Sequence, residues 1–283
     1  MEQSQRIAIV GLGLIGGSLG MVLRRRKLAH TVVGFSRNPA TLRAAKSLGA
    51  IDEGTGDLKT AVREADIVVL ATPVSEIVPL ALRCARFMKP GAILTDVGSS
   101  KGEIVAALDR LLPKAVAFVG AHPVAGSEKR GIGAATSAIF DASSYCIITP
   151  SARTNRRALR TVSSLWGGVV PKITQLPAKR HDALLAATSH LPHALAFALS
   201  ASAPDGGLPS MPRSFLEMTR VAKSDPDLWA AILLSNRSAV AAAWREFDRS
   251  SAALRKAITR KDRKALTRLL AKAKARRDDC KEQ

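Results

Sequence analysis

The chain has 283 residues, of which 47% are hydrophobic and 23% are charged, and its formal net charge is +20. This length predicts two domains, and the hydrophobic content excludes a globally disordered chain. The three cysteines are far apart and odd in number, which excludes a disulfide framework and a metal-binding spacing and favours a reducing, cytoplasmic setting. The uncharged run over residues 7–23 is short for a membrane span, contains glycines and lacks a basic leader, so we expect neither export nor membrane insertion.

The first half of the chain alternates short apolar runs with helical patterns. Helical patterns such as residues 79–87 and 103–111 lie between most of the apolar runs. This alternation predicts an α/β fold with a doubly wound parallel sheet and helices on both faces. The strands that we expect cover residues 7–10, 31–35, 67–71, 92–97, 117–121, 145–149 and 169–174.

After Pro177 the valine- and isoleucine-rich runs give way to alanine- and leucine-rich helical patterns, for example over residues 182–200 and 228–247. We therefore place the domain boundary near residue 176, with a dinucleotide-binding domain over residues 1–176 and an all-helical domain over residues 177–283. Many apolar helix faces in the second domain have no sheet to cover them, which predicts a homodimer through this half.

Lys and Arg residues are concentrated between Arg255 and Lys281. One interpretation is a nucleic-acid-binding arm. The alternative is a solvated helix face, because Leu254, Ile258 and Leu269 interleave with the bases at helical spacing and the segment has no aromatic residue to stack on a base. We favour the solvated face and expect no nucleic-acid partner.

A glycine-rich turn follows the first expected strand in "IAIVGLGLIGGSLG". Gly11, Gly13 and Gly16 have the G-x-G-x-x-G spacing of a dinucleotide-binding, Rossmann-like domain. Leu14 and Ile15 open the next helix, where backbone N–H groups can face a pyrophosphate. The strand before the turn and the helix after it predict nucleotide binding rather than a structural turn.

The second expected strand ends in "GFSRNP", where many such domains have an acidic residue that binds a ribose. Ser36 stands there instead, so the repulsion of an extra phosphate is absent, and Arg37 can pair with that phosphate. This predicts that NADP is preferred over NAD, although a polar turn that accepts both cofactors has the same sequence.

Polar residues follow three further strands at the edge that carries the glycine turn. Thr72 and Pro73 come after the third of the expected strands and are candidate cofactor contacts. Ser99 follows the next strand, and His122 leaves the one after it, with Pro123 favouring an extended exit. These positions make Ser99 and His122 candidates for chemistry, although a lone histidine is more often structural.

The helical half contributes two pairs at four-residue spacing. Ser189 and His193 share a helix face if the helix tolerates Pro192. Arg220 and Ser224 form the second pair, and Arg220 can bind a carboxylate through two parallel hydrogen bonds. Spacing alone does not distinguish this from a surface arginine.

These segments together resemble the prephenate/arogenate (cyclohexadienyl) dehydrogenase family of tyrosine biosynthesis. The resemblance spans nearly the whole chain and rests on "GLGLIGGSL", "ATPV", "DVGSSKG", "HPVAGSE", "SHLPH" and "MTRVAKSDP", in that order. It implies an oxidative decarboxylation of prephenate to 4-hydroxyphenylpyruvate: hydride passes from the hydroxyl-bearing ring carbon to a nicotinamide, carbon dioxide departs, and the ring becomes aromatic.

The resemblance also implies residue roles. His122 matches the histidine that accepts the hydroxyl proton, and Ser99 matches a serine that orients it near the nicotinamide. Arg220 matches the arginine that binds the substrate carboxylate. The residues that would line the pocket or stand at its mouth are Ser127, Glu128, Ser189, His193 and Ser224.

Two other enzyme activities remain as alternative interpretations of the sequence. Arogenate differs from prephenate by an amine in place of the keto group, and we favour prephenate because the basic surroundings give an ammonium little stabilisation. A β-hydroxyacid-type dehydrogenase has the same two-domain plan but depends on a lysine in its helical domain. Pro212 and Arg213 depart from the glycine-rich approach that the family often has before its arginine.

Overall fold

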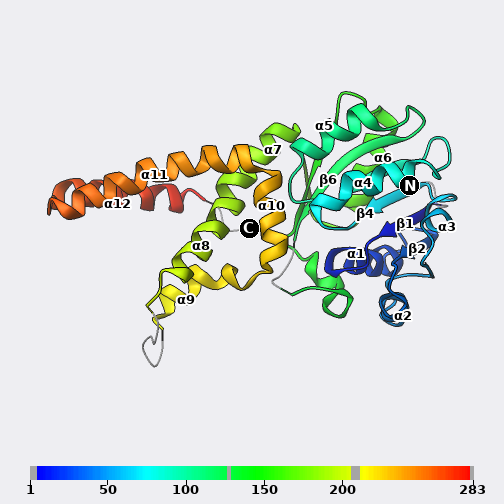
Figure 1. The fold of residues 1–283 in the computed structure, drawn as a ribbon, viewed down its shortest axis with the longest axis horizontal. Coiled ribbons are helices and arrows are strands. Elements are labelled where there is room, and N and C mark those ends of the chain that lie inside the picture. Colours follow the sequence, from blue (N-terminus) through cyan, green and yellow to red (C-terminus); the bar gives the residue numbers. More distant parts are fainter. Residues whose placement is uncertain (1–4, 126–128, 205–210, 281–283) are drawn as a thin grey trace.

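The computed structural model describes residues 5–125, 129–204 and 211–280. An eight-stranded sheet with helices on both faces forms the first half of the chain, and a group of helices forms the second (Figure 1). The strands are β1 (Arg6–Val10), β2 (Thr31–Phe35), β3 (Glu53–Thr55), β4 (Ile67–Leu70), β5 (Ile93–Asp96), β6 (Ala117–Val124), β7 (Tyr145–Thr149) and β8 (Lys172–Gln175). The helices of this half are α1 (Leu14–Arg25), α2 (Pro39–Ser47), α3 (Leu58–Val62), α4 (Val74–Ala85), α5 (Gly102–Leu111) and α6 (Arg156–Gly167).

The strand order is β3-β2-β1-β4-β5-β6-β7-β8, and the strands from β3 to β6 are parallel. The direction of winding reverses between β1 and β4, which is where sheets of this type bind ligands at the carboxyl ends of their strands. The expected parallel sheet is therefore confirmed as mostly parallel. The exception is the edge formed by β7 and β8, because β7 pairs antiparallel with β6.

Alternation along β1 explains why both faces of the sheet are covered. Ile7 and Ile9 face the core shared with α1 and α6, whereas Ala8 and Val10 face the core shared with α3, α4 and α5. Successive side chains of a strand point to opposite faces, so a strand buried on both sides is apolar throughout. The sequence pattern did not predict β3, because its three residues, Glu53 to Thr55, include no large apolar side chain.

A long, nearly continuous helical run opens the second half. It consists of α7 (Ala178–Leu185), the π-helical turn η3 (Ala186–His190) and α8 (Leu191–Ala201). The run tolerates Pro192 because this residue is at the second position of α8, directly after the π-helical turn. In the described part of the chain, residues 178–201 are the one helical run long and apolar enough to cross a membrane, a test that core helices of soluble proteins also pass.

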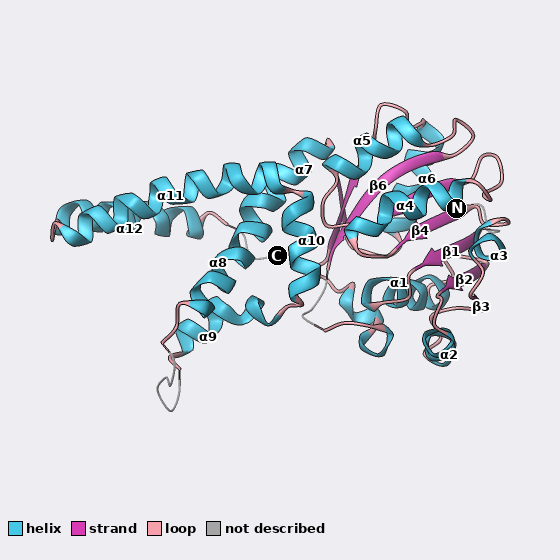
Figure 2. Ribbon diagram, in the orientation of Figure 1, coloured by secondary structure: helices cyan, strands magenta, loops and turns pink. Residues whose placement is uncertain are grey.

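The remaining helices are α9 (Arg213–Thr219), the 3-10 turn η4 (Arg220–Lys223), α10 (Pro226–Ser235), α11 (Arg237–Thr259) and α12 (Arg263–Asp278). The helix expected over residues 228–247 is broken at Asn236, which is buried and separates α10 from α11. α11 extends away from the sheet. α12 runs back along α11, so that the two helices form a helical hairpin (Figures 1 and 2). The sheet and the helical half meet where α10 packs on α4 and α7 packs on α5.

Candidate functional site

The glycine turn is built so that side chains would not fit at two of its three positions. Gly11 has a φ of +103°, and a Cβ atom there would lie 2.4 Å from the carbonyl oxygen of Ala71 on the neighbouring strand end. A Cβ at Gly16 would lie 2.0 Å from the carbonyl oxygen of Gly11. A Cβ at Gly13 would meet nothing within 4 Å, so the backbone there faces open space that a ligand can approach.

A cavity of about 540 Å³ adjoins this turn, between the carboxyl ends of the strands and α10. Its lining includes the predicted cofactor residues Gly13, Leu14, Ile15, Thr72, Pro73 and Ser99. Among the described residues, no partner satisfies the buried hydroxyl oxygen of Thr72, and a buried polar group without a partner is costly unless a ligand or water completes it. The open approach at Gly13 and this hydroxyl both fit a dinucleotide.

Ser36 and Arg37 lie beside the turn rather than in the lining of the cavity. The N–H of Gly11 donates to the carbonyl of Phe35 at 3.3 Å, which brings the end of β2 next to the glycines. The Ser36 hydroxyl accepts a hydrogen bond from the N–H of Asn38 at 3.2 Å, and Arg37 is exposed. The positions suit contact with a ribose at the outer end of a bound dinucleotide.

His122 lies inside a strand, not at a strand end as the sequence pattern predicted. Parallel pairing with β5 stops at Val119, but antiparallel pairing with β7 carries β6 onward, so that His122 pairs with Ile147 and Pro123 with Cys146. The side chain is 8% exposed. Burial, and then the nearby side chains of His181, Lys101 and His190, hold the pKa of His122 well below its usual range, so the ring is neutral at pH 7.

The partner of His122 is a histidine of the helical half. Nδ1 of His122 lies 2.9 Å from Nε2 of His181, and Nδ1 of His181 lies 2.8 Å from Oδ1 of Asp182. Asp182 also accepts hydrogen bonds from the N–H groups of Lys101 (2.8 Å) and Gly102 (2.7 Å) at the start of α5. These contacts join the two halves of the chain directly behind His122.

Ser99 does not orient His122 in this structure. No hydrogen bond joins its hydroxyl to His122, and its backbone carbonyl instead pairs with His190. Burial lowers the pKa of His190 to about 4, so this ring is a neutral hydrogen-bonding group. The amide nitrogen of Asn236 lies 3.1 Å from Nδ1 of His190 and donates to the carbonyl of Asp182 at 2.9 Å.

A buried ion pair supports the loop that contains Ser99. The ammonium of Lys101 pairs with Asp96 at the end of β5, and both side chains are fully buried. Asp96 also accepts hydrogen bonds from the N–H groups of Gly98 (2.9 Å) and Ala121 (3.2 Å). These extra hydrogen bonds are what a buried ion pair requires to be tolerated, and they fix the ends of β5 and β6 relative to each other.

The predicted substrate residues of the helical half lie around His193. Its Nδ1 donates to the carbonyl of Ser189 at 2.9 Å, and its ring stacks on Trp229 at 3.6 Å. Burial is the main cause that lowers the pKa of His193, and the positive charge of Arg220 adds to it, so the two side chains are close enough to interact. Arg220 is exposed at the start of η4, and Ser224 is half-buried directly after this turn. Ser127 and Glu128 lie outside the described residues.

Sequence patterns missed five residues of this network: His181, Asp182, His190, Trp229 and Asn236. Although His190 lies within the segment "SHLPH", helix periodicity alone assigns all five to ordinary buried faces. The adjacent His-Asp pair in "AKRHDALL" was the one available signal, because two titratable residues on the buried side of a helix are uncommon.

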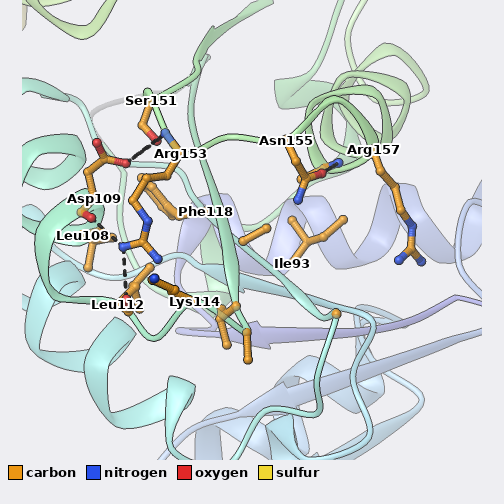
Figure 3. A pocket seen from close by; sticks show the side chains of 15 residues that line it. Ile93, Leu108, Asp109, Leu112, Lys114, Phe118, Ser151, Arg153, Asn155 and Arg157 are labelled. Carbon is orange, nitrogen blue, oxygen red and sulfur yellow. Dashed lines mark hydrogen bonds between the residues drawn. The ribbon is translucent and has the colours of Figure 1, made fainter.

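A second cavity, of about 310 Å³, lies at the amino ends of β5 and β6, on the opposite edge of the sheet (Figure 3). Arg153 crosses it and donates to the carbonyls of Asp109 (2.5 Å) and Leu112 (3.1 Å), while the Ser151 hydroxyl donates to the Asp109 carboxylate at 2.6 Å. These bonds hold the loop of Ser151 and Arg153 against the end of α5.

Comparison with known proteins places both halves in one family. Residues 19–175 match the family model described as "Prephenate dehydrogenase, nucleotide-binding domain", and residues 177–272 match "Prephenate dehydrogenase, dimerization domain". A cyclohexadienyl dehydrogenase of Zymomonas mobilis is 34% identical over 269 residues, which cover 93% of this chain and 91% of the relative.

Two solved structures have the same fold over nearly the whole chain. A prephenate dehydrogenase from A. aeolicus, in complex with hydroxyphenyl propionate and NAD+, has a TM-score of 0.89 and 33% identity, covering 97% of this chain and 98% of that one. An arogenate dehydrogenase from Synechocystis has a TM-score of 0.82 and 30% identity, covering 96% and 99%. The similarity therefore extends to relatives named for both substrates.

Proposed function

Because this chain belongs to the prephenate dehydrogenase family, we propose that it catalyses the oxidative decarboxylation of prephenate to 4-hydroxyphenylpyruvate in tyrosine biosynthesis. It is an NAD(P)-dependent dehydrogenase with a nucleotide-binding domain and a dimerisation domain. The observation that supports the reaction best is His122, a buried neutral imidazole three residues before Ala125, which lines the cavity that fits a dinucleotide.

His122 acts as the general base of this reaction. A buried imidazole that is neutral at pH 7 can accept the proton of the substrate hydroxyl. Ala125, three residues further along the chain, and Ser99 both line the cavity. A bound nicotinamide supplies the hydride acceptor, and departure of carbon dioxide from the opposite ring carbon makes the ring aromatic.

Arg220 and His193 hold the substrate in this proposal. Arg220 provides a charge that is exposed and near His193, as binding of a carboxylate requires. His193 is oriented by its hydrogen bond to Ser189 and by stacking on Trp229, so that its Nε2 is free to accept a hydrogen bond. Ser189, Ser224, Ser127 and Glu128 complete the proposed substrate pocket, and Ser99, which lines the cavity, is proposed to lie near the nicotinamide.

Prephenate is the proposed substrate, with arogenate as the alternative. The chain is strongly basic, so the additional ammonium of arogenate would gain little from the protein's field. The test is a four-way assay of purified enzyme with each substrate and with each of NAD and NADP. Turnover of prephenate with release of carbon dioxide is expected, and turnover of arogenate alone would reverse the assignment.

NADP is the proposed preferred cofactor. Ser36 stands where an acidic residue would repel the extra phosphate, and Arg37 is an exposed cation beside it. The glycines, Leu14, Ile15, Thr72 and Pro73 would bind the part of the dinucleotide that NAD and NADP share. The polar turn alone is compatible with NAD as well, so the preference depends on these two side chains.

The enzyme is proposed to act as a homodimer in the cytoplasm, with its domains divided at residue 176. Cys84 and Cys146 are free and buried, and burial raises the pKa of the Cys84 thiol to about 12, which suits a protein of a reducing compartment. No nucleic-acid or membrane partner is part of the proposal, because the basic end of the chain is a solvated helix, α12, without aromatic residues.

A further inference from the structure

We infer that His181 and Asp182 are positioning residues that fix the tautomer of His122 and stabilise its protonated form. The inference rests on the proposed role of His122 as general base. It starts from a chain of three side chains in which Asp182 contacts His181 and His181 contacts His122, at 2.8 Å and 2.9 Å. Asp182 and His181 come from α7 of the helical half, whereas His122 comes from β6 of the sheet.

The carboxylate of Asp182 sets the first proton position. Two backbone N–H groups at the start of α5 and a ring nitrogen of His181 all point at this carboxylate. Burial on its own would raise the pKa of Asp182, but these hydrogen bonds outweigh it and lower the pKa, so the group is an anion that can only accept. Nδ1 of His181 must therefore hold a proton.

The second proton position follows from the first. Burial lowers the pKa of His181, so its ring is neutral and has one N–H, which already points at Asp182. Its Nε2 is then an acceptor, and Nδ1 of His122 must be the donor across the 2.9 Å contact. The neutral His122 ring thus has a bare Nε2, which is the atom a general base needs. None of the described residues donates a hydrogen bond to Nε2 of His122.

The same chain stabilises the charge that catalysis creates. When the substrate hydroxyl gives its proton to Nε2, His122 becomes a cation surrounded by His181, His190 and Lys101, with Asp96 paired to the lysine. Among the residues that the structure describes, the remaining anion facing this cluster is Asp182, which reaches it through His181. If the Nδ1 proton of His122 moves to Nε2 of His181, the positive charge comes to lie in hydrogen-bond contact with Asp182. A carboxylate plays this role behind the histidine of hydrolase triads.

A purely structural role for Asp182 also has to be considered. Lys101 offers no side-chain cap to α5, and Asp182 supplies that cap from the other domain. A Cβ atom on Gly102 would lie 2.7 Å from Oδ2 of Asp182, so the sequence leaves room for this carboxylate. A cap alone, however, would not require the His181 ring between Asp182 and His122, and the two roles predict different measurements.

The first experiment is Asp182→Asn. An asparagine amide can donate to Nδ1 of His181, which would move the His181 proton to Nε2 and the His122 proton to its own Nε2. The base would then be blocked by its own proton. We expect kcat to fall about 100-fold or more, with the Kd for the cofactor unchanged within about twofold. A cap that only holds the domains together would instead weaken cofactor binding and leave kcat near that of the wild type, which would overturn the inference.

The second experiment compares two substitutions of the middle residue. His181→Gln keeps an acceptor near the position of Nε2, whereas His181→Leu has none. We expect the glutamine variant to retain at least tenfold more kcat than the leucine variant. Ser235→Ala is the matched control, because its hydroxyl bridges the domains through Ser100 at 2.8 Å but lies outside the three-residue chain. Equal losses in the glutamine and leucine variants, or a comparable loss in Ser235→Ala, would contradict the inference.

The third measurement does not depend on substrate. The chain has five histidines, so the nitrogen resonances of a histidine-labelled sample can be assigned by single substitutions. Proton–nitrogen correlation spectra distinguish a ring nitrogen with a proton from a bare one. The wild type should show His122 with its proton on Nδ1, and Asp182→Asn should move it to Nε2; His122 protonated on Nε2 in the wild type would refute the inference. An enzyme inactive on prephenate and arogenate would refute the proposed function but leave this spectrum informative.

Discussion

At the residue scale, the burial of His122 determines how it can act. Its pKa is held below the usual imidazole range by burial and by neighbouring His181, Lys101 and His190, so the neutral, basic form persists as the pH falls. The acidic limb of the profile of kcat/KM against pH should therefore lie below about pH 6.5, the ordinary value for histidine. A limb at or above pH 6.5 would show that the pKa of His122 is not lowered as the structure indicates.

Removal of this base gives the first mutational prediction. His122→Asn should lower kcat by roughly 100-fold or more and leave cofactor binding nearly unchanged, which is the usual scale for loss of a general base. The control is His30→Asn, because His30 is exposed directly before β2. Steady-state kinetics at pH 7.5 would decide, and a normal kcat in His122→Asn would remove the histidine from the mechanism.

Arg220 gives a prediction about binding rather than chemistry. Loss of a charge-assisted, bidentate contact to a carboxylate costs about 2–4 kcal/mol, so Arg220→Ala should raise KM for the substrate by about 30-fold or more. Lys223→Ala is the matched control, because Lys223 is an exposed cation of the same turn, η4. If both variants kept the wild-type KM, the substrate carboxylate would have to be bound elsewhere.

The cofactor preference depends on Ser36. Ser36→Asp would place a carboxylate beside the extra phosphate of NADP and opposite the ribose hydroxyls of NAD. Hydrogen bonds to a charged group contribute about 1.5–3 kcal/mol, so the ratio of kcat/KM for NADP to that for NAD should fall by about 10- to 100-fold. Arg37→Ala should weaken NADP alone. A wild type that prefers NAD, or a ratio that the aspartate leaves unchanged, would rule out the proposed preference.

At the element scale, the π-helical turn η3 and the break at Asn236 bring the helical half onto the sheet. His190, in η3, pairs with the carbonyl of Ser99 and accepts from Asn236, between α10 and α11. The hydrogen bond from Asn236 requires a bare Nδ1 and therefore a neutral ring, whereas the carbonyl of Ser99 favours the protonated ring; burial is the main reason why the pKa of His190 is lowered to about 4. Protonation of this one side chain therefore opposes the buried contact with Asn236.

The pH dependence of stability follows from the sign of that shift. The unfolded chain binds a proton at His190 below about pH 6.5, whereas the folded chain resists protonation until about pH 4, so stability is complete above pH 6.5 and falls between these values. A shift of this size corresponds to about 3 kcal/mol by pH 4. Urea unfolding of His190→Gln should show a shallower loss between pH 7 and pH 4 than the wild type, and an identical slope would exclude His190 as a cause.

Sequence periodicity predicted the central strands well because each is an unbroken apolar run between turn residues. It failed where tertiary contacts decide the outcome. β3 has no apolar residues to indicate a strand. The antiparallel direction of β7 depends on how the chain returns to the sheet. At the helix break, the buried side-chain amide of Asn236 forms hydrogen bonds with Asp182 and His190. A helical pattern that continues through such a residue cannot reveal the break.

In the candidate site, too, residues placed by local sequence could be predicted, whereas residues placed by tertiary contacts could not. The positions of the glycine turn, Thr72 and Pro73 could be predicted because these candidate cofactor residues follow strand ends, and all of them lie at the cavity or beside it. The residues that orient His122 could not, because His181 and Asp182 are about sixty positions away and come from the other domain. Their contact with His122 exists only after the two domains have packed together.

At the scale of the whole molecule, the helical hairpin of α11 and α12 leaves large apolar side chains exposed, although α11 packs on α7, η3 and α8. α12 has no buried residue, and Phe247, Ile258 and Leu270 are 38%, 61% and 53% exposed. The helical run over residues 178–201 is apolar but has only 28% of its most apolar window buried. Apolar helix faces of this extent are stabilised when a second subunit covers them, and this part of the chain matches a dimerisation domain.

The purified protein should therefore have twice the chain mass of 30.0 kDa, about 60 kDa, in sedimentation equilibrium at micromolar concentration. Ile258→Glu places a charge on the exposed apolar face of α11 and should shift the equilibrium toward the monomer. Leu111→Glu is the matched control, because Leu111 is 47% exposed at the end of α5 in the nucleotide-binding domain, and it should leave the mass unchanged. A wild-type mass near 30 kDa that does not depend on concentration would contradict the homodimer, because the hairpin would then be stable with its apolar face in water.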